Sequence, residues 1–180
     1  MPEKLDFITP TLMTVLEFFL SEPMQEYHER EVVRRTKVSK GSANKILRML
    51  ASKSFLLREK KGRMVFYRLN AKDSMVRQFK VLVNVYTLKD LLTQMKEHCR
   101  RIILFGSCAQ GTDVKESDID LLILTSEKEL IRRRISEYNR KNKRKIAPIV
   151  ADANEFIKLK REDKPLYENI EKGIVLWETE

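Results

Sequence analysis

Residues 101–124 decide the fold of the second half of the chain. They read Arg101-Ile-Ile-Leu-Phe-Gly-Ser-Cys-Ala-Gln-Gly-Thr112, then five further residues, then Asp118-Ile-Asp-Leu-Leu-Ile-Leu124. The first run is apolar and β-like and ends at Gly106-Ser107, and the second run continues from two aspartates as a buried strand. Since side chains two residues apart on a strand lie on one face, the carboxylates of Asp118 and Asp120 are predicted to lie together.

The order of these parts resembles the signature of the polymerase-beta-like nucleotidyltransferases, in which an apolar strand and Gly-Ser are followed by Asp-x-Asp on the next strand. The similarity is greatest to the minimal nucleotidyltransferases of bacteria and archaea. It covers residues 99–178, where Lys172-Gly-Ile-Val-Leu-Trp177 is similar to the way these short domains close. The resemblance implies a small mixed α/β nucleotidyltransferase-like domain, expected at residues 98–180.

The chemistry of such a site explains the spacing of its residues. Two neighbouring carboxylates offer the hard oxygen ligands that Mg²⁺ prefers, and glycine lets the backbone approach a phosphate closely. A serine hydroxyl beside a helix N-terminus adds a further donor to the anion. We therefore predict Asp118 and Asp120 as catalytic and metal-binding residues, and Gly106, Ser107 and Ser117 as nucleotide-binding residues. The alternative is that the aspartates are surface residues on an edge strand.

The resemblance also implies a substrate and partners. A nucleoside triphosphate, expected to be ATP, would bind with Mg²⁺, and its nucleotidyl group would pass to a hydroxyl of a protein side chain or of a small molecule. Family analogy adds an antitoxin or regulatory role with a toxin partner. The alternative function is that of a catalytically silent transcriptional regulator whose second half senses a nucleotide or dimerises.

One part of the family pattern is missing from this sequence. Active members carry a third carboxylate on a later strand, but the corresponding run, residues 145–151, has Ala147 and Pro148 where it is expected. Asp152 lies beyond that strand and would substitute only in an unusual register. Pro148 indicates that the strand lies at a sheet edge or contains a bulge. The thiol of Cys108, beside the phosphate bend, is expected to be small and buried rather than nucleophilic.

Positive charge is concentrated in the first half of the chain. The whole sequence has 36 Lys and Arg against 26 Asp and Glu, a net charge of +10, and the stretch from Arg34 to Lys72 holds 13 basic residues and one acid, Glu59. That stretch is therefore net +12 and the rest of the chain net −2. A localised field of this kind is typical of proteins that bind nucleic acid. The alternative is a solvated face that keeps the protein soluble.

The same half has the element order of a small helical domain with a hairpin. Capping residues and apolar spacing predict helices that begin after Thr9, at Glu29 and after Ser39. Two strands, Phe55–Glu59 and Arg63–Leu69, are predicted to follow, with the turn at Lys60-Lys61-Gly62. This order resembles the winged helix-turn-helix of transcriptional regulators over residues 8–72. It implies three helices plus a β-hairpin in a DNA-binding domain at residues 1–73.

Duplex geometry assigns roles to the basic side chains of this half. The major groove admits one helix, whose N-terminal part lies nearest the base edges. On the third helix, the predicted base-side residues are Lys40, Ser42, Asn44 and Lys45. The predicted phosphate contacts are Arg48, Lys60, Lys61 and Arg63. Double-stranded DNA is the expected partner, and the alternative is a protein-interaction module.

Residues 74–97 are predicted to form a helical linker. Their apolar stripe shifts phase near Thr87, which indicates either a kinked helix or two consecutive helices. The linker would either form a homodimer or pack on the second domain.

Composition excludes several classes of protein. The hydrophobic fraction of 42% is enough for a core, and no apolar run approaches the roughly 18 residues that cross a bilayer. Two cysteines are too few for a disulfide framework, and the N-terminus lacks the features of a signal peptide. We therefore expect a soluble, cytoplasmic α+β protein that does not bind membranes.

Overall fold

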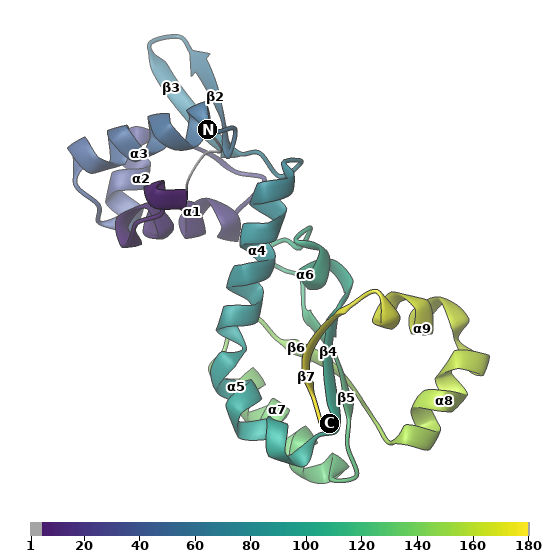
Figure 1. The fold of residues 1–180 in the computed structure, drawn as a ribbon. Helices are drawn as coiled ribbons and strands as arrows, with labels where there is room; N and C mark the ends of the chain where they lie inside the picture. The colour runs from purple at the N-terminus through teal and green to yellow at the C-terminus, as the bar shows by residue number, and fades with distance from the viewer. Residues whose placement is uncertain (1–4, 180) are drawn as a thin grey trace. The chain divides into compact units, whose positions relative to one another are not determined.

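The computed structural model describes residues 5–179, and the chain separates into two compact units between Arg77 and Gln78. Figure 1 labels the elements of both units, and each unit is described by itself below. The domain limits expected at residues 73 and 97, as limits of function, stay predictions.

The first unit contains three α-helices and a small antiparallel sheet. Its elements are the 3-10 helix η1 (Leu5–Phe7), α1 (Pro10–Ser21), β1 (Glu26–His28), α2 (Glu29–Thr36), α3 (Lys40–Ser52), β2 (Leu56–Lys61) and β3 (Met64–Leu69). The strands pair in the order β1-β3-β2. Helices followed by a β-hairpin are the arrangement of a winged helix, as the sequence predicts. The short strand β1 is an addition to that prediction.

Local signals explain where these helices begin and which faces they bury. The hydroxyls of Thr9 and Ser39 accept hydrogen bonds from the backbone N–H groups of Leu12 and Ser42, which confirms both predicted N-caps. The predicted stripe of α3 is buried in the core of the unit and consists of Ala43, Ile46, Leu47 and Leu50. The opposite face of α3 is therefore left for polar and basic side chains.

The hairpin turn lies later in the chain than the sequence predicts. Lys61 pairs with Met64, so Lys60 and Lys61 belong to β2 and the turn consists of Gly62 and Arg63. Gly62 has φ +61°, a conformation that residues with a Cβ rarely adopt. A two-residue hairpin needs this conformation at its first central position, which is why glycine and not lysine sets the turn.

The second unit is a four-stranded sheet with helices on both faces. Its elements are most of α4 (Ser74–Thr87), α5 (Lys89–Met95), the 3-10 helix η2 (Lys96–His98), β4 (Arg101–Phe105), α6 (Gly106–Gln110), β5 (Ile119–Leu124), α7 (Lys128–Lys141), β6 (Ile146–Ala151), α8 (Ala153–Glu162), α9 (Lys164–Glu171) and β7 (Ile174–Glu178). The phase shift near Thr87 is the break between α4 and α5, which confirms the expectation of two consecutive helices.

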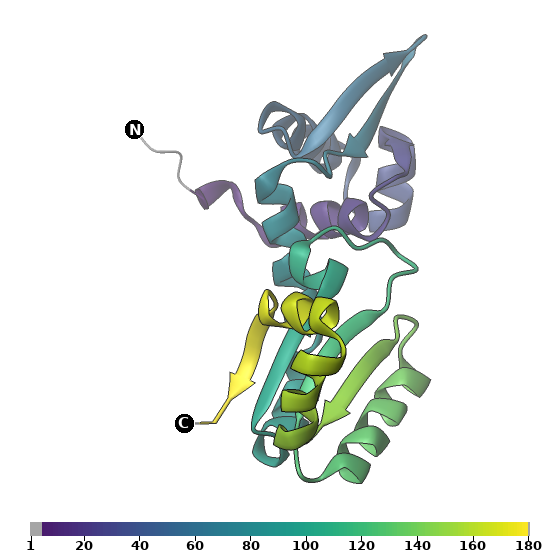
Figure 2. The same cartoon turned by 90° about the vertical axis from the view of Figure 1, so that its right-hand side faces the viewer.

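The strand order β6-β5-β4-β7 places the two signature strands in the middle of the sheet. Strands β5 and β6 are parallel and the other pairs are antiparallel. Pro148 lies on the edge strand β6, as predicted, where its missing N–H interrupts no hydrogen bond to a further strand. The C-terminal strand β7 closes the sheet beside β4, and Figure 2 shows this yellow strand along the edge of the unit.

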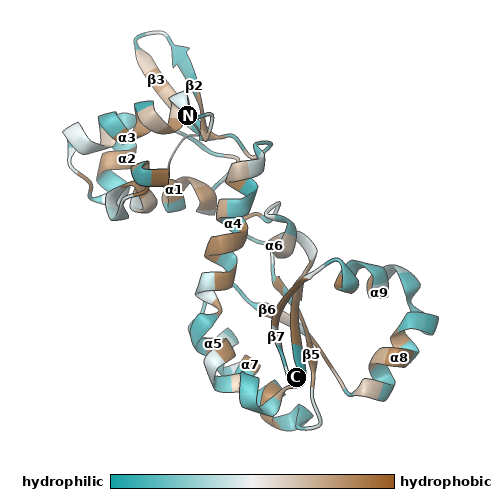
Figure 3. Ribbon diagram, in the orientation of Figure 1, coloured by the Kyte–Doolittle hydropathy of each residue, from teal (hydrophilic) through white to brown (hydrophobic). Residues whose placement is uncertain are grey.

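Alternate side chains of β5 enter two different cores. Leu121 and Ile123 pack with residues of α5 and α7 on one face of the sheet, while Leu122 packs with residues of α8 and α9 on the other. The three side chains have no exposed area, which confirms the predicted buried strand. In Figure 3 the strands of this sheet are the brown, hydrophobic centre of the unit. Among residues 5–179, the structure contains no helix with both the length and the apolar character needed to cross a membrane.

Candidate nucleotidyl-transfer site and basic surface

The Gly-Ser bend lies directly against one of the two predicted carboxylates. Strand β4 ends at Phe105, which pairs with Asp120 of β5, and the chain turns at Gly106 with φ +67°. A Cβ on Gly106 would stand 3.2 Å from Cγ of Asp120 and would collide with its Oδ2. The positive φ therefore favours glycine at this position, and a Cβ would in addition displace the Asp120 carboxylate.

The two aspartates lie at the beginning of β5, outside the apolar core. Asp118 is exposed and precedes the strand, whereas Asp120 is half-buried. Burial and the negative charge of Asp118 raise the pKa of Asp120, and the nearby Arg144 guanidinium acts in the opposite direction. Two repelling carboxylates, one of them partly desolvated, form a site whose charge a bound cation would compensate.

The other predicted nucleotide-binding residues flank this pair in the sequence. Ser107 is half-buried in the first turn of α6, and Ser117 is half-buried directly before Asp118. The Ser117 hydroxyl accepts a hydrogen bond of 2.9 Å from the backbone N–H of Val114, and this bond closes the loop ahead of the carboxylates. The roles of these residues toward a nucleotide stay predictions.

The neighbouring strand supplies no third carboxylate. In the regular parallel register of β5 and β6, Ala147 is the partner of Asp120, and its methyl group is exposed. Asp152 lies beyond the far end of β6, where it caps α8 and forms an ion pair of 2.8 Å with Lys128. The hydrogen bond from Lys128 holds the pKa of Asp152 at about 2. The unusual register that would bring Asp152 to the site is therefore absent.

Within residues 5–179, no cluster of three or more His, Cys, Asp and Glu side chains is placed to hold a metal ion. Cys108, in α6, is buried as predicted, and burial raises the pKa of its thiol to about 11. It is consequently neutral at ordinary pH and unsuited to nucleophilic attack.

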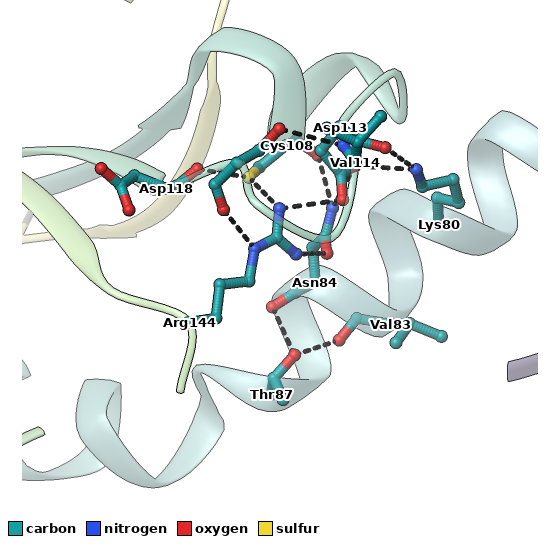
Figure 4. A network of polar contacts seen from close by, with 10 residues as sticks. Lys80, Val83, Asn84, Thr87, Cys108, Asp113, Val114, Asp118 and Arg144 are labelled. Atoms are coloured by element: carbon teal, nitrogen blue, oxygen red, sulfur yellow. Dashed lines mark hydrogen bonds and ion pairs between the residues drawn. The ribbon is translucent and has the colours of Figure 1, made fainter. Parts of the chain in front are cut away.

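A buried polar network, shown in Figure 4, joins α4 to the loop between α6 and β5. Its centre is Asp113, whose side chain is 6% exposed and lies 2.8 Å from a guanidinium nitrogen of Arg144. Lys80 lies 3.5 Å from the same carboxylate and also donates to the Asp113 carbonyl, while Asn84 donates to Asp113 at 3.0 Å. Burial lowers the pKa of Lys80, and the Asp113 carboxylate acts against that shift.

Arg144 connects this network both to the loop before Asp118 and to α6, which follows the Gly-Ser bend. Its Nε donates to the carbonyl of Ser117 at 2.9 Å, and its Nη2 lies 2.9 Å from the sulfur of Cys108. The Cys108 thiol in turn donates to the carbonyl of Asp118 at 3.2 Å. The network thus fixes the backbone of Asp118 relative to α6, which follows the Gly-Ser bend.

Four residues of this network were not predicted from the sequence, namely Lys80, Asn84, Asp113 and Arg144. One signal was available, because Val76, Lys80 and Asn84 recur at intervals of four residues and all three are buried in α4. Polar side chains within an otherwise apolar stripe indicate buried partners. Nothing comparable in the sequence distinguishes Arg144 from the other basic residues around it.

Several of the predicted DNA-binding side chains come together in the first unit. Lys40, Ser42, Lys45 and Arg48 are exposed on α3. Lys40, Asn44 and Arg48 also line a hollow between α3 and the β2–β3 hairpin, together with Arg58 and Arg63 of the hairpin. We call this feature the α3–hairpin hollow.

Some of the predicted DNA-binding residues have protein partners, and others lie outside the hollow. Asn44 donates a hydrogen bond to a carboxylate oxygen of Glu29, at the start of α2. Lys61 forms an ion pair of 2.6 Å with Glu26 of β1, and Lys60 is exposed beside it on β2. The roles of all eight residues toward DNA stay predictions.

Comparison with known proteins gives a family match over the second half of the chain. The family described as "Polymerase beta, Nucleotidyltransferase" matches residues 87–180. A protein of Methanocaldococcus jannaschii, which carries the provisional name protein adenylyltransferase, is 41% identical over 68 residues. The matched segment is 34% of this chain and 69% of that protein.

Solved structures with related folds have low overall similarity. A structure from Sulfolobus solfataricus, provisionally described as a nucleotidyltransferase, has a TM-score of 0.36 at 19% identity and covers 58% of this chain and 86% of its own. The adhesin competence repressor of Streptococcus pyogenes has a TM-score of 0.38 at 14% identity, covering 52% of this chain and 69% of its own. The fold assignment therefore depends on the elements described above.

We expect Gly106→Ala to destabilise the second unit more than Gly62→Ala destabilises the first. Both positions have positive φ, which costs a residue with a Cβ about 1–2 kcal/mol, but only Gly106 has a carboxylate where the Cβ would stand. The fluorescence of Trp177, the single tryptophan of the chain, reports unfolding of the second unit, and far-UV circular dichroism reports both. Equal losses in the two variants would show that Asp120 moves aside freely.

We expect Asp113→Ala to destabilise the second unit by about 3–5 kcal/mol, because it leaves the buried Lys80 and the half-buried Arg144 without their counter-charge. Urea unfolding followed by Trp177 fluorescence measures the loss. The matched control is Glu116→Ala, which removes an exposed acid from the same loop and should change stability by less than about 0.5 kcal/mol. A loss no greater than in the control would contradict a stabilising network.

Proposed function

The chain belongs to the polymerase beta nucleotidyltransferase family, and from that membership we propose that its second unit binds a Mg²⁺–nucleoside triphosphate and transfers the nucleotidyl group to a hydroxyl. The observation that carries the proposal is the contact between Gly106 and the Asp120 carboxylate. It brings a backbone bend suited to phosphate next to a pair of carboxylates suited to a cation.

The residues present fit a divalent cation. Asp118 and Asp120 offer hard oxygen ligands, and the raised pKa of Asp120, caused by burial and by Asp118, indicates charge that a cation would relieve. When bound, Mg²⁺ would neutralise charge on the phosphate that is transferred. The Gly106–Ser107 bend would hold the phosphate groups, and Arg144 would keep the Asp118 backbone at a fixed distance from that bend.

The reaction would proceed by displacement at the α-phosphorus. The acceptor oxygen would form a bond to this atom while the bond to the bridging oxygen breaks and pyrophosphate leaves. Ala147 stands beside Asp120, where a third carboxylate could take the acceptor proton, so water would have to accept it. We propose ATP as the nucleotide and a protein side chain as the acceptor, in keeping with the name of the M. jannaschii relative. We place the reaction in the cytoplasm.

A second candidate function is nucleotide sensing without transfer. It is favoured by one observation, the exposed methyl group of Ala147 in the place of the missing carboxylate. A protein of this kind would bind the nucleotide at the same residues and would release it unchanged.

We expect Asp118→Asn and Asp120→Asn to reduce Mg²⁺-dependent binding of a fluorescent ATP analogue by at least about tenfold, because each removes a charged ligand of the cation. Glu116→Gln, on the same loop, is the control and should bind as the wild type does. Wild-type binding that is independent of Mg²⁺ and unchanged in both variants would contradict the proposed site.

Labelled ATP, Mg²⁺ and cell extract then separate the two candidate functions. Label transferred by the wild type and lost in Asp120→Asn supports transfer. Mg²⁺-dependent binding without labelled product supports sensing. Ala147→Asp adds the missing carboxylate at an exposed position and should increase the rate of transfer if only the proton acceptor is lacking.

We propose that the first unit binds duplex DNA. This proposal is supported by the net charge of +12 between Arg34 and Lys72 and by the position of basic side chains on α3 and on the hairpin. An exposed helix face flanked by a basic hairpin fits a major groove and its phosphates. Failure of the wild type to bind any duplex would contradict this proposal.

We expect Arg48→Ala to reduce the slope of log K against log salt concentration by about 0.9, the value for one lost phosphate contact. Fluorescence anisotropy of a labelled duplex, titrated at several salt concentrations, measures the slope. Lys158→Ala removes one exposed charge from α8 of the second unit and should leave the slope unchanged. Wild-type affinity that does not depend on salt would contradict phosphate-led binding.

A further inference from the structure

The α3–hairpin hollow contains one acid among the described side chains that line it. Glu29 is the first residue of α2, and it lies in the hollow together with His28 and several basic side chains. A carboxylate repels phosphate, so this position weakens any contact with the DNA backbone. A base edge is neutral and carries amino groups, and a carboxylate or its hydrogen-bonded partner can face such an edge at less cost.

Glu29 determines how the side chain of Asn44 is oriented. The Asn44 amide group donates to a Glu29 carboxylate oxygen, and both side chains are half-buried. An ionised carboxylate only accepts hydrogen bonds, whereas an amide group has two N–H donors on one side and an accepting oxygen on the other. The reversed amide would place two acceptor oxygens together. The amide nitrogen of Asn44 must therefore face Glu29, which leaves its second N–H and its Oδ1 for another partner.

The position of Asn44 on α3 makes the second N–H and the Oδ1 of its amide available to DNA. Asn44 lies between Lys40 and Arg48 at intervals of four residues, so the three side chains form one row along the helix, and all three line the hollow. Of the two flanking cations, Arg48 is a predicted phosphate contact and Lys40 a predicted base-side residue. The amide between them is the neutral group of the row, with one donor and one acceptor.

One base matches a donor and an acceptor presented side by side. In the major groove adenine offers its N7 acceptor and N6 amino donor, whereas guanine offers two acceptors, which would leave the asparagine oxygen facing another oxygen. Cytosine and thymine each offer a single polar group there. We propose that Asn44 reads an adenine in the major groove and that Glu29 is the positioning residue that orients its amide. This inference rests on the proposed binding of duplex DNA by the first unit.

Selection from a random duplex pool by the full-length protein tests the proposal. The wild type should enrich an adenine at one position of the bound sequences. In the selected duplex, replacing that adenine by 7-deazaadenine removes the N7 acceptor and keeps the N6 amino group. Affinity should fall, by at most about 5- to 150-fold, which is the equivalent of a whole bidentate base contact. Asn44→Ala should lose the preference at that position alone and keep its salt dependence.

Variants of Glu29 and Glu31 distinguish the orienting effect of Glu29 on the Asn44 amide from a general effect of negative charge on DNA affinity. Glu29→Ala should relax the adenine preference while binding to unselected duplex becomes stronger, because a negative charge has left the hollow. Glu31→Ala removes the same charge two residues later, outside the hollow, and should keep the preference. Far-UV circular dichroism checks that each variant is folded. A loss of stability alone would lower all affinities together and would not change the base preference.

Three results would overturn the inference. Salt-dependent binding by the wild type without any base preference would remove the adenine contact and leave DNA binding intact. An adenine preference that persists in Asn44→Ala would assign it to another side chain. Failure of the wild type to bind any duplex would overturn both the inference and the proposed binding of DNA.

Discussion

The contact between Gly106 and Asp120 is the constraint on which the second unit depends. Strands β4 and β5 pair along their whole length, so Phe105 lies opposite Asp120 and the turn after β4 is forced against that carboxylate. A side chain at position 106 would have to displace the Asp120 carboxylate. The apolar pairing of the two strands thus supplies the force that holds a charged group next to a backbone bend.

The buried network around Asp113 holds the loop between α6 and β5 in place beside the Gly106–Ser107 bend. Residues 111–118 contain little regular structure, and such a loop would normally move. Asp113 is held by two cations and by Asn84, and Arg144 fixes the carbonyl of Ser117. A buried charge is tolerated only when it is paired and hydrogen-bonded, so the arrangement of this network is specific. It determines the geometry of the backbone before Asp118, although none of its side chains belongs to the predicted carboxylate pair.

What the sequence predicted well are features with a local cause. Thr9 and Ser39 cap helices by contacts with residues three positions later. The run Leu121–Ile123 is buried, as its apolar composition predicts. Asp118 precedes β5 and Asp120 lies within it, and the negative charge of Asp118 acts on Asp120 as expected for carboxylates two residues apart in an extended segment. Fold class, helix positions and the central strands could therefore be expected without coordinates.

What the sequence did not predict depends on contacts between distant residues. Strand β1 has three residues and exists because it pairs with β3, some forty residues later. Arg144 reaches Asn84 across 60 positions, and no periodicity links the two. The hairpin turn was misplaced because Lys60-Lys61 is polar enough for a turn, while the backbone conformation at Gly62 decided the register. The composition of a segment indicates whether its residues are buried or exposed, but it does not indicate which distant residue they contact.

The two units place opposite demands on charge, and the sequence separates them. Binding a phosphate backbone requires exposed cations, whose attraction falls with salt because they are screened over about 10 Å. Holding a cation and a triphosphate requires paired acids and buried, hydrogen-bonded charges, which screening affects much less. Residues 34–72 of the first unit are net +12, whereas the second unit, residues 78–180, has 20 Lys and Arg against 17 Asp and Glu and is net +3. Glu29 is the one acid among the described side chains that line the α3–hairpin hollow. It begins α2, where the helix dipole favours a carboxylate, and it also accepts a hydrogen bond from the neutral amide of Asn44.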